Sequence, residues 1–114
     1  MFNFFYDTKK HGEGTEKHRV FFINRKLNCI PISDFLGIVI FMYFNEHNPP
    51  HFHAKYNEFK AEILIETLSL KEGKLPPRIL GLVTEWAELH KEELMENWNS
   101  LKKTGEYKRI KPLI

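Results

Sequence analysis

The sequence predicts an α+β fold in which a three-stranded antiparallel sheet is followed by one long C-terminal helix, with room for an extra N-terminal strand. Three observations lead to this prediction. An apolar run at residues 35–44 is typical of a strand, and apolar and polar residues alternate through residues 50–65 as in a hairpin. Apolar residues then recur at steps of three and four through residues 77–102, which indicates a helix. At 114 residues the chain has room for one small domain.

Residues 1–30 are predicted to be an N-terminal extension, and residues 31–114 to be a single globular domain. The polar, glycine-containing segment KKHGEGTEKH is a loop by composition, whereas RVFFI at residues 19–23 is typical of one strand. The six basic and three acidic side chains of residues 1–30 give this extension a net charge of +3.

Residues 35–44, FLGIVIFMYF, are too apolar for a strand with one wet face and are typical of a strand covered on both sides. The strand should stop at NEHNPP, because neither proline can donate a hydrogen bond to a neighbouring strand. The run is about half as long as a membrane-spanning helix. No membrane partner is therefore predicted.

Residues 50–65 are expected to form a hairpin with a two-residue turn at Asn57 and Glu58. Asparagine tolerates the positive φ that such a turn requires. This register pairs Tyr56 with Phe59, Lys55 with Lys60, Ala54 with Ala61, His53 with Glu62, Phe52 with Ile63, and His51 with Leu64. The two lysines repel each other, but a slip by one residue would turn a whole apolar face outward.

The helix is predicted to run from about Pro77 to about Lys102, because a proline pair suits a helix start, where the missing amide proton costs nothing. Its apolar stripe, which has one longer step between Leu89 and Leu94, comprises Ile79, Leu82, Val83, Trp86, Leu89, Leu94, Trp98 and Leu101. We interpret both tryptophans as core residues and the glutamates of the opposite side as solvated. Residues 106–110 either add a short edge strand or trail behind the helix.

The stretch NEHNPPHFHA supplies the candidate site. His51 and His53 alternate along one strand, so their side chains project side by side from the face that is predicted to be exposed. His47 enters from the preceding loop. Glu62, opposite His53, is expected to accept a ring proton and to raise the basicity of that imidazole. Lys55, on the same face, would steady the charge of a phosphate.

This set of residues supports two chemistries. In the first, imidazoles act as general base and general acid in RNA cleavage, without metal or cofactor, because the pKa of histidine lies near working pH. In the second, His47, His51 and His53, with Glu62, ligate zinc or another divalent ion; their spacing permits this without being diagnostic. A third interpretation makes the hairpin a partner-binding surface. His90, on the apolar stripe of the helix, is expected to be a core histidine that faces the sheet.

Charge and cysteine content narrow the possible functions. The net charge of +2 is too small to imply nucleic-acid binding by itself. A basic cluster near the C-terminus could nevertheless meet phosphate: Lys102, Lys103, Lys108, Arg109 and Lys111. Cys29 is the only cysteine, which excludes an intramolecular disulfide and a thiolate zinc cluster. We expect a protein of the reducing cytoplasm.

Several segments between residues 31 and 112 resemble one known small bacterial family: PIS, GIVIFMYFNEHNPPHFHAKY, ETL, EGKLP and EWAELHKEELMENW. The family is the domain of unknown function numbered four-one-six-zero. Its members are often encoded beside another small protein, in pairs that look like type II toxin and antitoxin operons. The resemblance therefore implies a toxin-like protein with a small antitoxin-like partner, and it implies no catalytic residue. Members usually have a methionine directly before the P-x-I-S-like start, where this chain has Ile30. This departure from the family pattern implies that residues 1–29 are either an added arm or a gene model extended upstream.

The function predicted from the sequence is that of a toxin-like, metal-independent ribonuclease. His51 and His53 would carry the reaction, with His47, Lys55 and Glu62 in support. The alternatives are a non-enzymatic interaction or regulatory module that binds a small partner protein, and a metal-binding protein. RNA is the second expected partner, and the exposed edges of a small sheet favour a homodimer or a partner strand.

Overall fold

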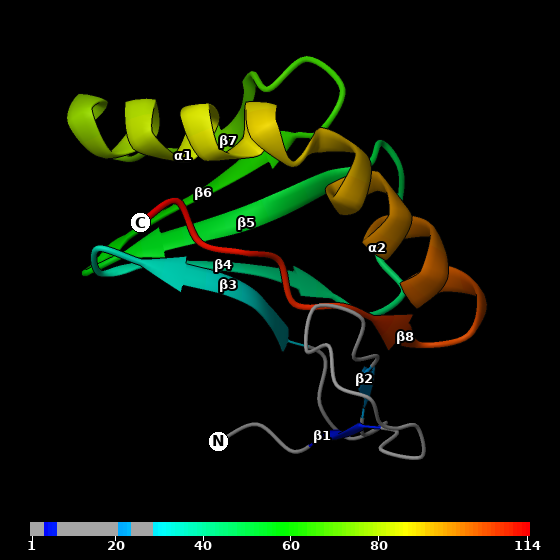
Figure 1. The fold of residues 1–114 in the computed structure, drawn as a ribbon. Coiled ribbons are helices and arrows are strands. Elements are labelled where there is room, and N and C mark those ends of the chain that lie inside the picture. The colour runs from blue at the N-terminus through cyan, green and yellow to red at the C-terminus, as the bar shows by residue number, and fades with distance from the viewer. Residues whose placement is uncertain (1–3, 7–20, 24–28) are drawn as a thin grey trace.

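The computed structural model describes residues 4–6, 21–23 and 29–114, and these residues form two antiparallel sheets and two helices (Figure 1). The elements are β1 (Phe4–Tyr6), β2 (Phe21–Ile23), β3 (Cys29–Phe35), β4 (Ile38–Tyr43), β5 (His51–Tyr56), β6 (Phe59–Leu64), β7 (Leu70–Gly73), α1 (Pro77–Leu89), α2 (Lys91–Lys103) and β8 (Glu106–Tyr107). Strands β3 to β7 form the larger sheet in chain order. Strands β1, β2 and β8 form the smaller one.

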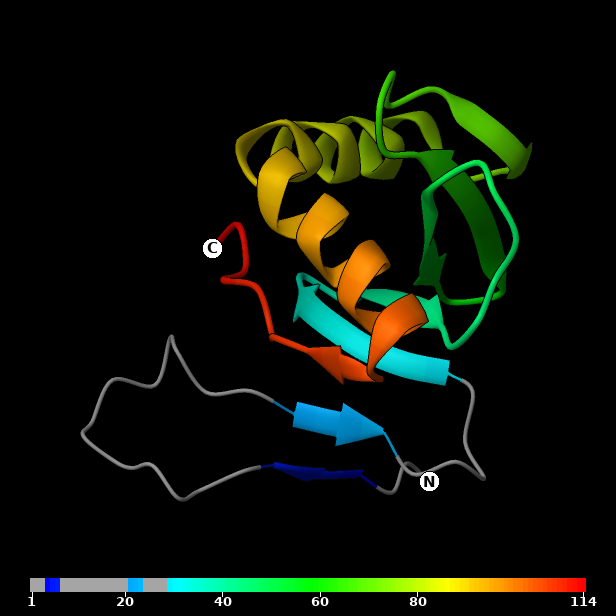
Figure 2. The same cartoon turned by 90° about the vertical axis from the view of Figure 1, so that its right-hand side faces the viewer.

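The smaller sheet joins the two ends of the chain. Strand β2 lies between β1 and β8, and Figure 2 shows the three side by side below the helices. Strand β2 falls within the strand predicted at residues 19–23, and β8 is the short strand predicted as one of two outcomes for residues 106–110. The loop predicted at residues 9–18 lies outside the described residues.

The fold is α+β, but the predicted three-stranded sheet was wrong, because two further segments extend it at both edges. Strand β3 pairs with β4, and β7 pairs with β6. Strand β3 contains Pro31 and an irregularity in pairing between Pro31 and Ser33, whereas all four residues of β7 are exposed. Neither segment therefore shows the regular alternation by which strands are recognised in a sequence.

The apolar run at residues 35–44 is also divided differently from the prediction. Phe35 ends β3, and a turn at Leu36 and Gly37 leads into β4. Both turn residues have positive φ, 52° and 79° respectively, a region that costs glycine little. The run is thus the end of one strand, a turn and the whole of the next strand.

The single long helix was likewise wrong, because the helical segment divides at His90. Figure 1 shows α2 turning away from α1 at this junction. The break coincides with the longer step in the apolar stripe between Leu89 and Leu94. Leu89 is 67% exposed and Leu94 is fully buried, so a change of direction keeps the apolar face of α2 on the core.

The core lies between one face of the larger sheet and the two helices (Figures 1 and 2). It includes Trp86 and Trp98, as predicted. The C-terminal segment closes one side: the amide of Ile110 donates to the carbonyl oxygen of Ile32 at 2.9 Å, and the indole of Trp86 donates to the carbonyl oxygen of Lys111 at 2.8 Å. No helix in the described part of the chain is long and apolar enough to cross a bilayer.

The predicted hairpin register is confirmed at every pair of β5 and β6. Asn57 has a φ of 53°, the positive value expected for the turn. The like-charged pair, Lys55 and Lys60, is exposed to solvent, and the ammonium group of Lys55 donates to the carbonyl oxygen of Asn57 at 2.8 Å. This register fixes which side chains of β5 share a face, and it thereby positions the candidate site.

Candidate metal centre

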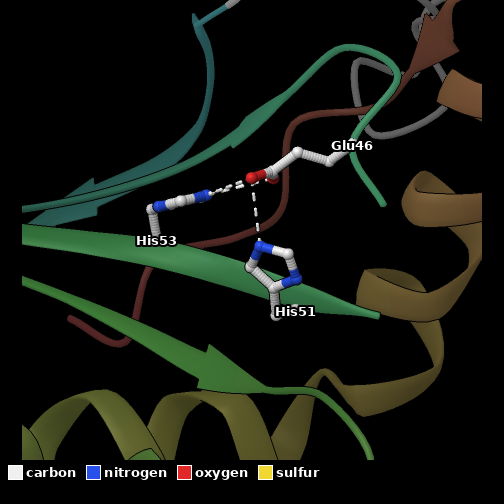
Figure 3. A group of neighbouring side chains, drawn as sticks. All are labelled: Glu46, His51 and His53. Atoms are coloured by element: carbon white, nitrogen blue, oxygen red, sulfur yellow. Dashed lines mark hydrogen bonds and ion pairs between the residues drawn. The ribbon is translucent and has the colours of Figure 1, made fainter. Parts of the chain in front are cut away.

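Two histidines of β5 and a glutamate from the loop that precedes this strand converge at one place (Figure 3). His51 and His53 are alternate residues of β5 and therefore share a face of the sheet. Glu46 lies between β4 and β5, and its carboxylate points toward both imidazoles. One nitrogen from each imidazole and a carboxylate oxygen lie within 4.8 Å of one another.

The ring of His51 is oriented by the backbone of its own loop. Its Nδ1 lies 2.8 Å from the carbonyl oxygen of Pro49. Because a carbonyl oxygen only accepts, Nδ1 carries the proton in this contact, and Nε2 of the neutral ring carries a lone pair. This Nε2 is buried and has no hydrogen-bond partner among the described residues. Glu46 Oε2 lies 3.1 Å from it, but in a direction that does not form a hydrogen bond.

The ring of His53 is oriented by Glu46 and by two aromatic side chains of β4. Its Nε2 lies 3.0 Å and 3.2 Å from the two carboxylate oxygens of Glu46, so Nε2–H donates to that carboxylate. The imidazole stacks on Phe41 at a centroid distance of 5.1 Å and meets Tyr43 edge to face at 4.7 Å. These contacts fix the plane of the ring.

Aromatic side chains also shield the two imidazoles from solvent, whereas the side chain of Glu46 is 23% exposed. The ring of His51 lies 5.3 Å from that of Trp98 in α2 and 5.1 Å from that of His53. The His51 and His53 side chains are only 4% and 10% exposed. The exposed histidine face predicted from the sequence was therefore wrong. Electrostatic interactions inside such a site are stronger than they are in water.

Glu62 lies beside the site but does not make the predicted contact. It is paired with His53 in the strand register, yet His53 bonds to Glu46 instead. Glu62 Oε1 accepts a hydrogen bond from Lys71 at 3.1 Å and lies 3.7 Å from Nε2 of His51. Burial by itself raises the pKa of Glu62, but the hydrogen bond from Lys71 and the neighbouring positive charges outweigh it and hold this pKa below its ordinary value.

The other candidates from the sequence lie outside the site. His47 is exposed in the loop, and Lys55 is exposed and bonded to its own turn. His90 lies at the junction of the helices, where its Nδ1–H donates to Glu93 Oε1 at 2.6 Å and its ring lies 5.4 Å from that of Trp86. It is half-buried at this junction, where the sequence predicted a core histidine facing the sheet.

Sequence reasoning missed Glu46 and the aromatic residues around His53. Glu46 precedes His53 by seven residues and reaches it only because the loop folds back, which strand alternation does not reveal. Phe41 is directly opposite His53 in the pairing of β4 with β5. A predicted register for that strand pair would have placed Phe41 beside the imidazole.

The arrangement has the composition of a transition-metal site. Two imidazoles and one carboxylate bind zinc in hydrolases and iron in oxygenases. A tetrahedral zinc site has ligand distances of roughly 2.1 Å, which places neighbouring ligand atoms roughly 3.4 Å apart. The carboxylate of Glu46 lies 3.0 Å from His53 Nε2 and 3.1 Å from His51 Nε2. Both separations are near the value expected for neighbouring zinc ligands, and all three donor atoms lie within 4.8 Å of one another.

Comparison with known proteins identifies the family of the chain. The family model described as Domain of unknown function (DUF4160) matches residues 37–99, more than half of the sequence. The matched region includes the three residues of the candidate metal centre. No curated protein and no solved structure matches the chain. The resemblance predicted from the sequence is confirmed, and the chain belongs to the DUF4160 family of domains of unknown function.

Proposed function

We propose that this protein is a metal-binding domain that holds one divalent transition-metal ion between Glu46, His51 and His53. The observation that carries the proposal is the environment of His51 Nε2. This nitrogen is buried and accepts no hydrogen bond from the part of the chain that the structure describes, and a carboxylate oxygen lies 3.1 Å away. A lone pair and a carboxylate repel each other at this distance, so a cation between them would turn the contact into an attraction.

A metal ion suits this gap better than a second proton on the imidazole does. A proton on Nε2 needs an acceptor in line with the N–H bond, and Glu46 is not so placed. The contact of Nδ1 with the carbonyl oxygen of Pro49 is the one that commonly supports a metal-ligating histidine from behind. His53 joins the set once its ring proton moves from Nε2 to Nδ1, which leaves a second lone pair for the ion.

The donor set selects the class of ion. Imidazole nitrogen favours zinc and its neighbours in the first transition series, whereas magnesium and calcium require mainly oxygen ligands. With one carboxylate and two neutral imidazoles, the site carries one negative charge against the two positive charges of the ion. Because two of the three donors are nitrogens, Zn²⁺ is the appropriate probe, and Mg²⁺, which carries the same charge but prefers oxygen, is the control.

The proposal is tested by competition between the protein, purified without a histidine tag, and a chromogenic zinc chelator. We expect one Zn²⁺ per chain, with about tenfold or greater loss of affinity in His51→Ala, His53→Ala and Glu46→Gln. His47→Ala is the matched control, because His47 is exposed in the same loop and should keep wild-type affinity. Equal affinity in wild type and Glu46→Gln would refute the proposed site, provided circular dichroism shows both to be folded.

The second candidate is the toxin-like, histidine-dependent ribonuclease with a small antitoxin-like partner. One observation favours it: two imidazoles with ring centroids 5.1 Å apart lie beside one carboxylate, and such a pair can supply a general base and a general acid. It ranks second because RNA must reach nitrogen atoms that the aromatic side chains shield. Growth arrest by the wild type but not by His51→Ala/His53→Ala, together with RNA cleavage that survives chelators, would favour the ribonuclease over the metal site.

A further inference from the structure

Resting on the proposed metal site, we infer that Glu62 is its fourth ligand and that Lys71 holds this carboxylate aside until the ion binds. Glu62 lies on β6 and Lys71 on β7, so neighbouring strands of the sheet present the carboxylate and its ammonium partner.

The distance from Glu62 to His51 supports this role. Glu62 Oε1 lies 3.7 Å from His51 Nε2, close to the separation of roughly 3.4 Å between neighbouring ligands of a tetrahedral zinc ion. The buried Nε2 thus has two carboxylates near it, that of Glu46 at 3.1 Å and that of Glu62 at 3.7 Å. Both carboxylates approach a buried nitrogen that has no hydrogen-bond partner among the described residues.

Lys71 accounts for the position of Glu62 outside the three-residue cluster. Its Nζ lies 3.1 Å from Oε1 of Glu62, the same oxygen that is near His51. The side chain of Lys71 is 32% exposed on an edge strand whose residues all face solvent. A long, partly exposed ammonium group is easily returned to water, so a divalent ion can replace it as the partner of Glu62.

Four protein ligands, two nitrogens and two oxygens, would give zinc a closed tetrahedral shell. Two carboxylates would also balance both charges of the ion in a site shielded by Phe41 and Trp98. A closed site leaves no position for a substrate or a reactive water. The metal would then serve to hold the loop that carries Glu46 against the sheet, and its binding would release Lys71 at the sheet edge.

The test combines a double-mutant cycle with the visible spectrum of bound Co²⁺. Glu62→Gln should weaken Zn²⁺ binding about tenfold and reduce the intense bands that four-coordinate Co²⁺ shows. Lys71→Met should tighten Zn²⁺ binding about threefold or more, and this gain should be largely lost in the Glu62→Gln background. Glu58→Gln and Lys74→Met, both exposed nearby, are the matched controls and should bind as the wild type does.

The outcomes separate this inference from the proposal beneath it. If Glu62→Gln keeps the wild-type Zn²⁺ affinity and Co²⁺ spectrum while Glu46→Gln loses binding, the three-residue site stands and the fourth-ligand inference is overturned. If Lys71→Met tightens Zn²⁺ binding equally in the wild-type and Glu62→Gln backgrounds, Lys71 acts by simple charge repulsion of the ion. The inference that the ion replaces Lys71 as the partner of Glu62 is then overturned. If the wild-type chain binds no Zn²⁺, both the proposed function and this inference fail.

Discussion

His51 and Glu46 approach each other at 3.1 Å, nitrogen to oxygen, without forming a hydrogen bond. The protein aligns the opposite side of the same imidazole well, since Nδ1 lies 2.8 Å from the carbonyl oxygen of Pro49. The hydrogen bond to Pro49 thus fixes the ring, and the unprotonated Nε2 faces the carboxylate of Glu46. A cation between Nε2 of His51 and the carboxylate of Glu46 would turn this contact into an attraction.

Zinc should stabilise the folded protein. Because the ligands come together only in the native state, Zn²⁺ at a free concentration 100 times its dissociation constant should add about 2.7 kcal/mol to the free energy of unfolding. Urea unfolding with and without Zn²⁺ measures this gain. Glu46→Gln should lose most of it, and Mg²⁺ should give none. A gain of the same size in Glu46→Gln would place the ion elsewhere.

Cobalt should quench the fluorescence of Trp98. The indole ring of Trp98 lies 5.3 Å from the imidazole of His51, so a paramagnetic ion on that imidazole would be close enough to quench it. Titration with Co²⁺ should lower the emission of the wild type, and Trp98→Phe should remove most of the change. Zinc competition checks that Trp98→Phe still binds the metal. If that variant binds Co²⁺ and loses the same fraction of its emission, the ion is not at His51.

The turn at Asn57 should tolerate glycine but not alanine. Its φ of 53° lies in the left-handed region, which costs alanine about 1 kcal/mol or more and costs glycine nothing in steric terms. Denaturant unfolding should therefore rank Asn57→Gly close to the wild type and Asn57→Ala below both. Equal stability of the two variants would contradict this account of the turn.

The break between the helices should be visible in two leucine substitutions. Leu89 is 67% exposed and Leu94 is fully buried. Leu94→Ala should cost about 2 to 5 kcal/mol, because it removes core contacts and leaves a cavity. Leu89→Ala should change stability by about 0.5 kcal/mol or less. Similar losses at both positions would mean that the apolar stripe continues through a straight helix.

Stability should fall in alkaline solution because of Tyr107. Burial raises the pKa of this buried phenol well above its ordinary value, against a smaller opposite effect of Arg109. The unfolded chain therefore loses the phenolic proton at lower pH than the folded chain does, and stability declines once the pH exceeds about 10. Unfolding measured between neutral and strongly alkaline pH should show the decline in the wild type and a smaller one in Tyr107→Phe. An equal decline in both would assign it to other groups.

The register of the hairpin could be predicted from the sequence, whereas the edge strands of the sheet could not. Alternation from Pro50 to Ile65 and a turn residue that accepts positive φ leave one register that buries the apolar face, and that register is observed. Strand β7, with every residue exposed, is instead defined by its backbone hydrogen bonds to β6. The break at His90 was already present as a longer step in the apolar stripe, but the predicted helix ran through it.

The sequence predicted the two histidines of the candidate site but not the residues that surround them. His51 and His53 share a strand face by local geometry, which the sequence reveals directly. Glu46 reaches them through a folded loop, and the burial of the imidazoles depends on Phe41, Tyr43 and Trp98 from other elements. Such contacts are tertiary, so the alternation of one strand does not contain them.

The most direct test of the metal site is anomalous X-ray diffraction from crystals of the tag-free protein grown with Zn²⁺, recorded on both sides of the zinc absorption edge. We expect one strong anomalous peak roughly 2.0 to 2.2 Å from Nε2 of His51, Nε2 of His53 and a carboxylate oxygen of Glu46. Strong peaks only at His47 or His90, with none between these three residues, would contradict it.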